Sequence, residues 1–217
     1  MSQVTVKVSS VTPRLFLASV ASKSLDKAAN LFPNKPRNQT RVAFIPTAAN
    51  PYKDKWFVKE DRNKLVEVGF DVFDVDIKDK TKRELGEELR NIDIIFVAGG
   101  NTFYLLDKVQ KSGFDKVVKR LVFGERVLYI GSSAGATLAG PDIKPVELLD
   151  DPSAAPDLQS TEGLNLVNFV VLPHYGDKKY EDKFQKIIEE YGNKYELIKI
   201  TNEQAVFVEG SDYYIAS

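Results

Sequence analysis

Short apolar runs bounded by turn residues alternate along this chain with longer amphipathic segments, and this alternation limits the possible folds more than any other feature. The short runs are rich in β-branched and aromatic residues, which is typical of buried strands, whereas the longer segments repeat apolar residues at helical spacing. Alternating strands and helices indicate a mostly parallel central sheet flanked by helices. We therefore expect an α/β fold in which residues 1–217 form a single domain, with 43% hydrophobic residues to fill its core.

The pattern can be divided into elements, with boundaries uncertain by a few residues. The expected strands are residues 14–19, 42–46, 70–76, 92–98, 126–130, 169–173, 196–200, 205–209 and 213–216. The expected helices are residues 59–68, 82–91, 102–112, 114–123 and 181–191. Residues 144–161 are rich in Pro, Asp and Ser and lack periodicity, so we expect a surface loop there.

Charge and hydropathy disfavour several classes of partner. The 30 basic and 31 acidic residues leave a net charge of −1, and no run of one sign could neutralise nucleic acid or anionic lipid. No apolar run approaches the roughly 20 residues that cross a bilayer. Residues 1–13 lack the apolar region of a secretory signal. We expect a cytoplasmic protein with no nucleic-acid or membrane partner.

The chain contains no cysteine and a single histidine, His174. Disulfides, thiolate nucleophiles and cysteine-based zinc sites are therefore excluded. No spacing of Asp and Glu resembles a metal-binding loop, so we expect neither metal nor cofactor. Any mechanism that needs an imidazole must use His174.

One apolar run leads directly into a Gly-x-Ser-x-Gly turn, Gly131 to Gly135, followed by a short helix-compatible stretch. A sharp turn between strand and helix lifts a serine hydroxyl above the sheet, which makes Ser133 a candidate nucleophile. The Ala134 N–H at the helix start would face a developing oxyanion. Ser132 is the competing choice but lacks glycines two residues to either side. The alternative is a tight turn that merely packs small residues.

A second run ends in Gly99-Gly100-Asn101-Thr102 just before an expected helix. Glycines there permit positive φ and leave N–H groups unobstructed, so Gly100 could supply a second oxyanion donor. Gly99 and Asn101 are then expected to contact the substrate. The alternative is a simple turn, and only its place at the carboxyl end of a strand favours a functional site.

His174 follows another apolar run, so it too stands at the carboxyl end of an expected strand, at the same sheet edge as Ser133. As general base it would take the Ser133 proton and return it to a leaving amine, provided that a third group holds its other ring nitrogen. The candidates for that third group are residues 201–204, Asp142, Glu147, Asp150 and Asp151.

These motifs together resemble the peptidase E and cyanophycinase group of serine peptidases, whose fold is similar to class I glutamine amidotransferases. The resemblance is strongest at residues 99–102, 131–136 and 172–175, in the order and at about the spacing of the family. It implies Ser133 as nucleophile, His174 as base, and the N–H groups of Gly100 and Ala134 as an oxyanion hole. It also implies cleavage after an N-terminal aspartate, without metal or cofactor.

Three positions depart from the family pattern. Asn202 stands where the family has an acidic third member, with Glu203 one position later. Lys183 stands where the dipeptidases carry an arginine for the substrate aspartate, and lysine lacks the bidentate fork. The stretch before Val167 also differs from the family, at a substrate-contacting element.

The function that we expect is hydrolysis of short peptides, Asp-X dipeptides among them, through an acyl-enzyme on Ser133. One alternative is an esterase or amidase that uses the same residues on another small substrate. Another is a catalytically weak homologue that binds a small anion at the helix start. An amidotransferase is excluded because that chemistry needs a cysteine. A small peptide is the expected partner, and the sequence leaves monomer and homodimer open.

Overall fold

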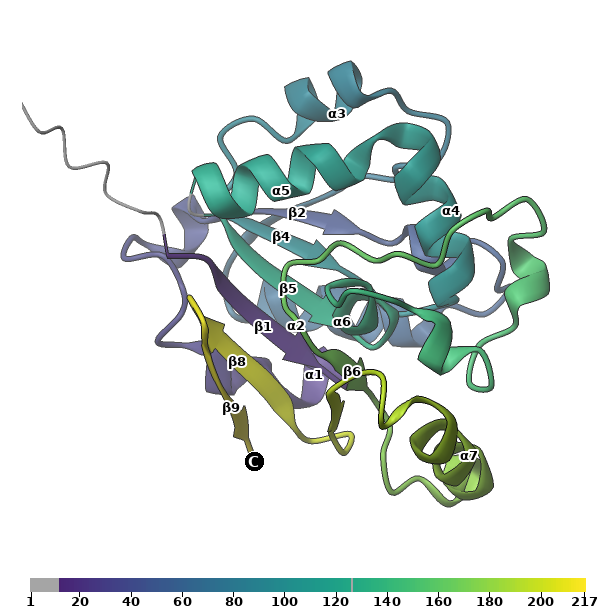
Figure 1. Ribbon diagram of the computed structural model, residues 1–217. Helices are drawn as coiled ribbons and strands as arrows, with labels where there is room; N and C mark the ends of the chain where they lie inside the picture. Colours follow the sequence, from purple (N-terminus) through teal and green to yellow (C-terminus); the bar gives the residue numbers. More distant parts are fainter. Residues whose placement is uncertain (1–11, 126) are drawn as a thin grey trace, which may run out of the picture.

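The computed structural model describes residues 12–125 and 127–217, so the expectations for the first 11 residues and for Arg126 lie outside the described part. A seven-stranded sheet, in the order β3-β2-β4-β5-β1-β8-β9, forms the centre (Figure 1). The strands are β1 (Arg14–Ala18), β2 (Arg41–Ile45), β3 (Asp71–Asp74), β4 (Ile94–Val97), β5 (Leu128–Ser132), β8 (Ala205–Glu209) and β9 (Asp212–Ala216). The first five in this order are parallel, β8 pairs antiparallel with β1, and β9 pairs antiparallel with β8. The predicted α/β fold with a mostly parallel sheet is confirmed.

Side chains alternate between the two faces of the sheet, and each face has its own core. In β4, Ile95 and Val97 enter one buried cluster, whereas Ile94 and Phe96 enter the other. Helices α1 (Ala21–Ser24) and α2 (Trp56–Glu67) cover the second cluster. The first cluster lies under α3 (Lys82–Glu88), α4 (Thr102–Ser112), α5 (Phe114–Gly124), α6 (Ala134–Leu138) and α7 (Glu181–Tyr191).

Several elements differ from the prediction at their ends. Helix α2 begins three residues earlier than expected and α3 ends three residues earlier, while α1 was not predicted. Short 3-10 helices occupy Leu25–Ala28, Arg37–Gln39, Thr47–Ala49, Lys144–Val146, Pro152–Ala154 and Lys178–Tyr180. The segment 144–161 is otherwise irregular, as expected. None of the helices in the described residues is long and apolar enough to cross a membrane.

Two of the predicted strands lie outside the central sheet. Strands β6 (Val170–Leu172) and β7 (Leu197–Lys199) pair with each other in a separate two-stranded parallel sheet. The central sheet has no place for them beside β1, because β5 and β8 already pair with its two edges. The expectation that His174 and Ser133 share one sheet edge was therefore wrong, since His174 follows β6 and Ser133 follows β5.

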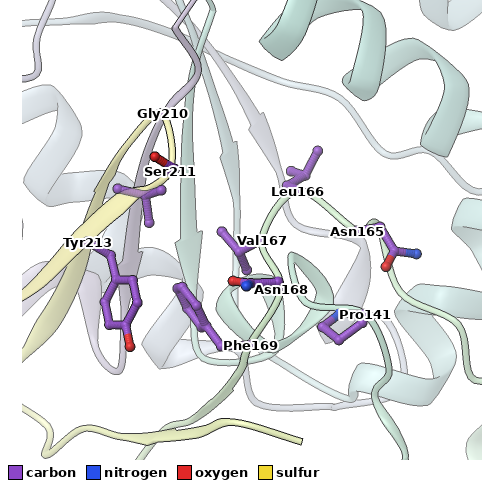
Figure 2. Close-up of a pocket in the computed structure, with 10 residues that line it drawn as sticks. Pro141, Asn165, Leu166, Val167, Asn168, Phe169, Gly210, Ser211 and Tyr213 are labelled. Atoms are coloured by element: carbon purple, nitrogen blue, oxygen red, sulfur yellow. The ribbon is translucent and has the colours of Figure 1, made fainter.

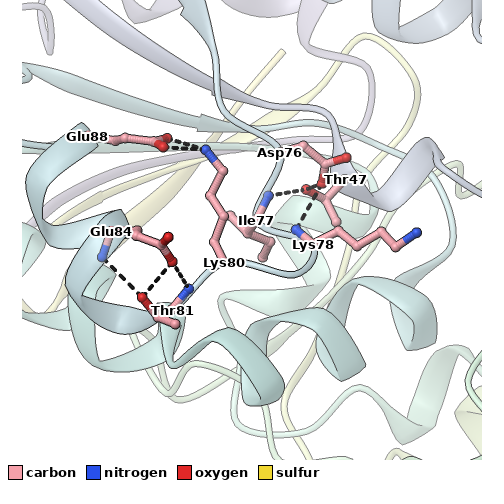
Figure 3. A network of polar contacts seen from close by, with 8 residues as sticks. All are labelled: Thr47, Asp76, Ile77, Lys78, Lys80, Thr81, Glu84 and Glu88. Carbon is pink, nitrogen blue, oxygen red and sulfur yellow. Dashed lines mark hydrogen bonds and ion pairs between the residues drawn. The ribbon is translucent and has the colours of Figure 1, made fainter.

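A polar network after β3 holds the loop that supports the turn after β4 (Figure 3). Asp76 accepts hydrogen bonds from the Thr47 hydroxyl at 2.7 Å and the Asn50 amide at 2.8 Å. Burial alone would raise the pKa of Asp76, but these hydrogen bonds outweigh burial and lower that pKa. The loop thus held presents the Ala48 carbonyl, which accepts the Asn101 N–H at 2.8 Å.

Helix α3 begins with a capping box that the same figure shows. The Thr81 hydroxyl accepts the Glu84 N–H at 3.3 Å, and the Glu84 carboxylate accepts the Thr81 N–H at 2.8 Å. These bonds satisfy N–H groups at the helix start and set the point at which the chain enters α3.

The turn between β5 and α6 is packed so closely that its glycines are required. A Cβ added to Gly135 would lie 2.1 Å from the Val97 carbonyl oxygen, and one added to Gly131 would lie 2.5 Å from the Gly135 carbonyl carbon. Both obstacles are backbone atoms, which cannot rotate aside. The two glycines of the Gly-x-Ser-x-Gly motif therefore allow α6 to pack against the ends of β4 and β5.

We predict that Gly135→Ala lowers the free energy of unfolding by about 3 kcal/mol or prevents folding, because the added methyl group overpacks the turn. The matched control is Gly86→Ala in α3, where a Cβ would meet nothing within 4 Å. That variant should gain roughly 0.5 to 1 kcal/mol from helix propensity. Urea denaturation of both variants checks this, and equal stabilities would contradict the packing argument.

Candidate active site

Ser133 stands at the sharp turn where β5 ends and α6 begins. Its backbone has φ 48° and ψ −106°, a conformation that L-residues rarely adopt. Its N–H donates to the Ala18 carbonyl at 2.9 Å, which ties the turn to the end of β1. Ser132 is 3% exposed, and its hydroxyl accepts the Ala21 N–H at 3.2 Å. The structure therefore places Ser133, and not Ser132, against the histidine.

His174 contacts Ser133 through one ring nitrogen and Asn202 through the other. The Nε2 atom lies 2.9 Å from the Ser133 Oγ, and the Nδ1 atom lies 2.7 Å from the Asn202 Oδ1. A carbonyl oxygen can only accept, so Nδ1 carries the proton and Nε2 presents its lone pair to the Ser133 hydroxyl. This is the tautomer that a general base requires.

The parallel pairing of β6 and β7 explains how residues 28 positions apart meet. Leu172 pairs with Lys199, so the carboxyl ends of both strands point to one place, and His174 and Asn202 follow there. Glu203 turns outward instead, where its carboxylate pairs with Lys23 at 3.2 Å. Of the two adjacent candidates, Asn202 is the one that reaches His174.

The other candidates for the third group bind elsewhere. Asp142 accepts the Tyr195 hydroxyl at 2.6 Å and Glu147 accepts the Tyr191 hydroxyl at 2.5 Å. Asp151 accepts the Ser153 N–H at 2.9 Å. None of these three carboxylates contacts the imidazole in the described residues.

A cavity of about 480 Å³ opens in front of Ser133 and His174. Gly99 and Gly100 line it, and Gly100 has φ 147°, with the Ala48 carbonyl oxygen only 2.2 Å from where a Cβ would lie. Among the described residues, neither the Gly100 N–H nor the Ala134 N–H donates a backbone hydrogen bond. Both residues line the same cavity as Ser133.

Two residues that the sequence favoured for substrate contact lie outside this cavity. The Asn101 side chain accepts the Tyr104 N–H and donates to the Asp151 carbonyl, both at 2.8 Å, because it caps α4. Lys183 stacks 5.6 Å from the Tyr180 ring and is absent from the cavity lining, whereas Lys179, four residues earlier, lines it. Spacing along the sequence alone could not distinguish these two lysines.

A second cavity of about 470 Å³ lies between the segment before β6 and the turn joining β8 to β9 (Figure 2). Its lining contains no Asp, Glu, Lys, Arg or His, and it shares no residue with the first cavity. The lining residues are Pro141, Asn165, Leu166, Val167, Asn168, Phe169, Val208, Gly210, Ser211 and Tyr213. The first cavity is therefore the one equipped for proton transfer.

Two buried carboxyl groups line the first cavity: Asp61, which the sequence did not place there, and Asp150, a candidate third group that binds Thr102 instead of the imidazole. Asp61 is 4% exposed and accepts the Ser22 N–H at 2.8 Å. Its spacing from Val58 and Leu65 puts it on the buried face of α2, a signal that was available in the sequence. Asp150 accepts the Thr102 N–H at 2.8 Å, and burial raises the pKa of Asp150 although the hydrogen bonds from Thr102 oppose this. In the described residues, no group of three His, Asp or Glu side chains is placed to hold a metal ion.

Burial raises the pKa of Asp61 from 3.8 to about 6, against the opposing hydrogen bonds of Ser132 and Ser22. Folding thus favours the protonated form, and this contribution to stability is complete below about pH 4 and is lost as the pH rises through 6. We predict that Asp61→Asn, which cannot ionise, gains roughly 2 to 3 kcal/mol of unfolding free energy over the wild type between pH 4 and pH 7. Urea denaturation across this range checks the prediction, and a difference independent of pH would contradict it.

Comparison with known proteins identifies relatives of this chain. The model of peptidase family S51 matches residues 15–216. The uncharacterized peptidase Lmo0363 of Listeria monocytogenes is 36% identical over 171 residues, which are 79% of this chain and 83% of that protein. Peptidase E of Streptomyces coelicolor is 33% identical over 140 residues, 63% of this chain and 52% of that protein.

A solved structure agrees with the sequence comparison. The crystal structure of a candidate peptidase E from Listeria monocytogenes EGD-e superposes with a TM-score of 0.86 and 31% identity, over 94% of this chain and 98% of that one. The match to the family model, over residues 15–216, covers both the central sheet and the segments that carry Ser133, His174 and Asn202. The chain therefore belongs to peptidase family S51.

Proposed function

We propose that this protein is a serine peptidase that cleaves short peptides through an acyl-enzyme on Ser133. The observation that carries the proposal is the contact of 2.9 Å between Ser133 Oγ and His174 Nε2, with Nδ1 held by Asn202. Ser133 as nucleophile contacts His174 as base, and His174 contacts Asn202 as orienting group, which is the arrangement that acyl transfer requires.

The proposed reaction follows from this order. The Ser133 oxygen attacks the scissile carbonyl carbon as His174 Nε2 takes the hydroxyl proton, and the oxyanion accepts the N–H groups of Gly100 and Ala134. Collapse breaks the C–N bond, and Nε2 passes its proton to the leaving amine. A water molecule then attacks the ester with His174 again as base, which releases the acid and restores Ser133.

Charges around the cavity support a short peptide with a free N-terminus as the substrate. The buried carboxyl groups Asp61 and Asp150 line the cavity and could pair with an α-ammonium group. Lys179 also lines it and could pair with an acidic side chain. Both pairings suit an Asp-X dipeptide, the substrate that the resemblance to peptidase E implies.

We predict that a fluorophosphonate labels the wild-type protein and that Ser133→Ala and His174→Ala abolish labelling, because the first lacks the nucleophile and the second lacks the base. The control is Ser153→Ala, an exposed serine, which should be labelled normally. In parallel, the same proteins are assayed on Asp-X, Glu-X and Ala-X dipeptides and a simple ester.

The outcomes separate the candidate functions. Cleavage of Asp-X that both substitutions abolish supports the dipeptidase, and ester turnover without peptide cleavage supports an esterase. Absence of labelling and of turnover would refute the hydrolase and leave a protein that binds small anions. Labelling that persists in Ser133→Ala would show that another residue is the nucleophile.

We further predict that Lys179→Met raises the KM for Asp-X roughly 10-fold with little change for Ala-X, because one charged pair contributes about 1.4 kcal/mol or more to binding. Lys183→Met, which removes a lysine outside the cavity lining, is the matched control and should leave KM within about 2-fold. A larger effect at Lys183 would restore the assignment that the sequence favoured.

A further inference from the structure

Ser19 is a fully buried residue that contacts both His174 and Asn202. It follows β1, directly after Ala18, whose carbonyl accepts the Ser133 N–H. The Ser19 Oγ accepts the peptide N–H of His174 at 2.8 Å. The same oxygen lies 3.3 Å from the Asn202 Oδ1 and 3.4 Å from the His174 Nδ1.

The direction of these hydrogen bonds can be worked out from what each group is able to do. A peptide N–H can only donate, so the Ser19 oxygen accepts there and its own proton remains free for another acceptor. Of the two possible acceptors, the Asn202 Oδ1 at 3.3 Å lies nearer to the Ser19 Oγ than the His174 Nδ1 at 3.4 Å. The Ser19 hydroxyl therefore donates to the Asn202 Oδ1.

This donation decides which end of the Asn202 amide faces the imidazole. The oxygen and the NH₂ group of an amide have nearly the same shape. If the NH₂ group faced His174, it would donate to Nδ1, and the ring proton would move to Nε2. A protonated Nε2 cannot accept the Ser133 proton. A carboxylate at position 202 would not have this ambiguity, because both of its oxygens accept.

We propose that Ser19 is a positioning residue. It accepts the His174 peptide N–H, donates its own proton to the Asn202 oxygen, and so keeps Nε2 of His174, which faces Ser133, unprotonated. The backbone N–H of His174 thereby sets the tautomer of the His174 ring through the side chains of Ser19 and Asn202. The statement about the tautomer depends on geometry alone, and only its effect on rate rests on the proposed function.

The tautomer is tested by ¹⁵N NMR of the imidazole at a pH where the ring is neutral. Since His174 is the only histidine, its two ring nitrogens need no assignment among others. The wild type should show one protonated and one unprotonated nitrogen. Ser19→Ala should move both shifts toward intermediate values, because the two amide orientations then interconvert. Ser24→Ala, another buried serine, donates only to a carbonyl and is the control that should leave both shifts unchanged.

A second variant guards against loss of folding. Ser19→Cys keeps a weak donor of similar shape and should give shifts between those of the wild type and Ser19→Ala. Wild-type shifts in a folded Ser19→Ala or Ser19→Cys would overturn the proposal. This readout needs no turnover, so it distinguishes failure of the tautomer proposal from failure of the peptidase proposal.

A double-mutant cycle tests the effect on rate. Ser19→Ala should lower kcat roughly 10-fold with Asn202 present, since one orienting hydrogen bond is lost. In the Asn202→Asp background the same substitution should lower kcat by less than about 3-fold, because a carboxylate has no amide to orient. A merely structural role of Ser19 predicts the same loss in both backgrounds, and that result would overturn the proposal.

Discussion

The close approach of backbone to backbone at the end of β4 and β5 is the constraint on which the site depends. Helix α6 can start there only because Gly135 leaves room for the Val97 carbonyl oxygen. Its start forces the unusual backbone of Ser133 and points the hydroxyl into the cavity. Three neighbouring strands then end close to Ser133. Strand β5 leads into Ser133, the end of β1 accepts the Ser133 N–H, and β4 leads into the turn at Gly99.

The partner of Ser133 comes from a separate unit. Strands β6 and β7 form their own small sheet, and their parallel register places His174 beside Asn202 before either meets Ser133. The two units are joined at the end of β1, where Ala18 binds the Ser133 turn and Ser19 binds the His174 turn. Adjacent residues at the end of β1 thus help to set the distance between Ser133 and His174.

The sequence was sufficient to predict the α/β fold, and it singled out Ser133 and His174, which lie 2.9 Å apart, because both follow buried strands. It could not show that β6 and β7 leave the central sheet, since a short apolar run looks the same in either sheet. Nor could it separate Asn202 from Glu203, because strand register decides which of two adjacent turn residues faces inward. Asp61 was overlooked because an acid in an amphipathic helix normally faces solvent.

Ser133 and His174 both have positive φ angles, 48° and 62°, which side-chain-bearing residues rarely adopt. Each such conformation costs on the order of 1 to 3 kcal/mol for a residue with a side chain, and the surrounding cores must supply this energy. Glycine at either position would relieve the strain and remove the reactive group in the same step. Stability alone therefore does not favour a serine at position 133 or a histidine at position 174.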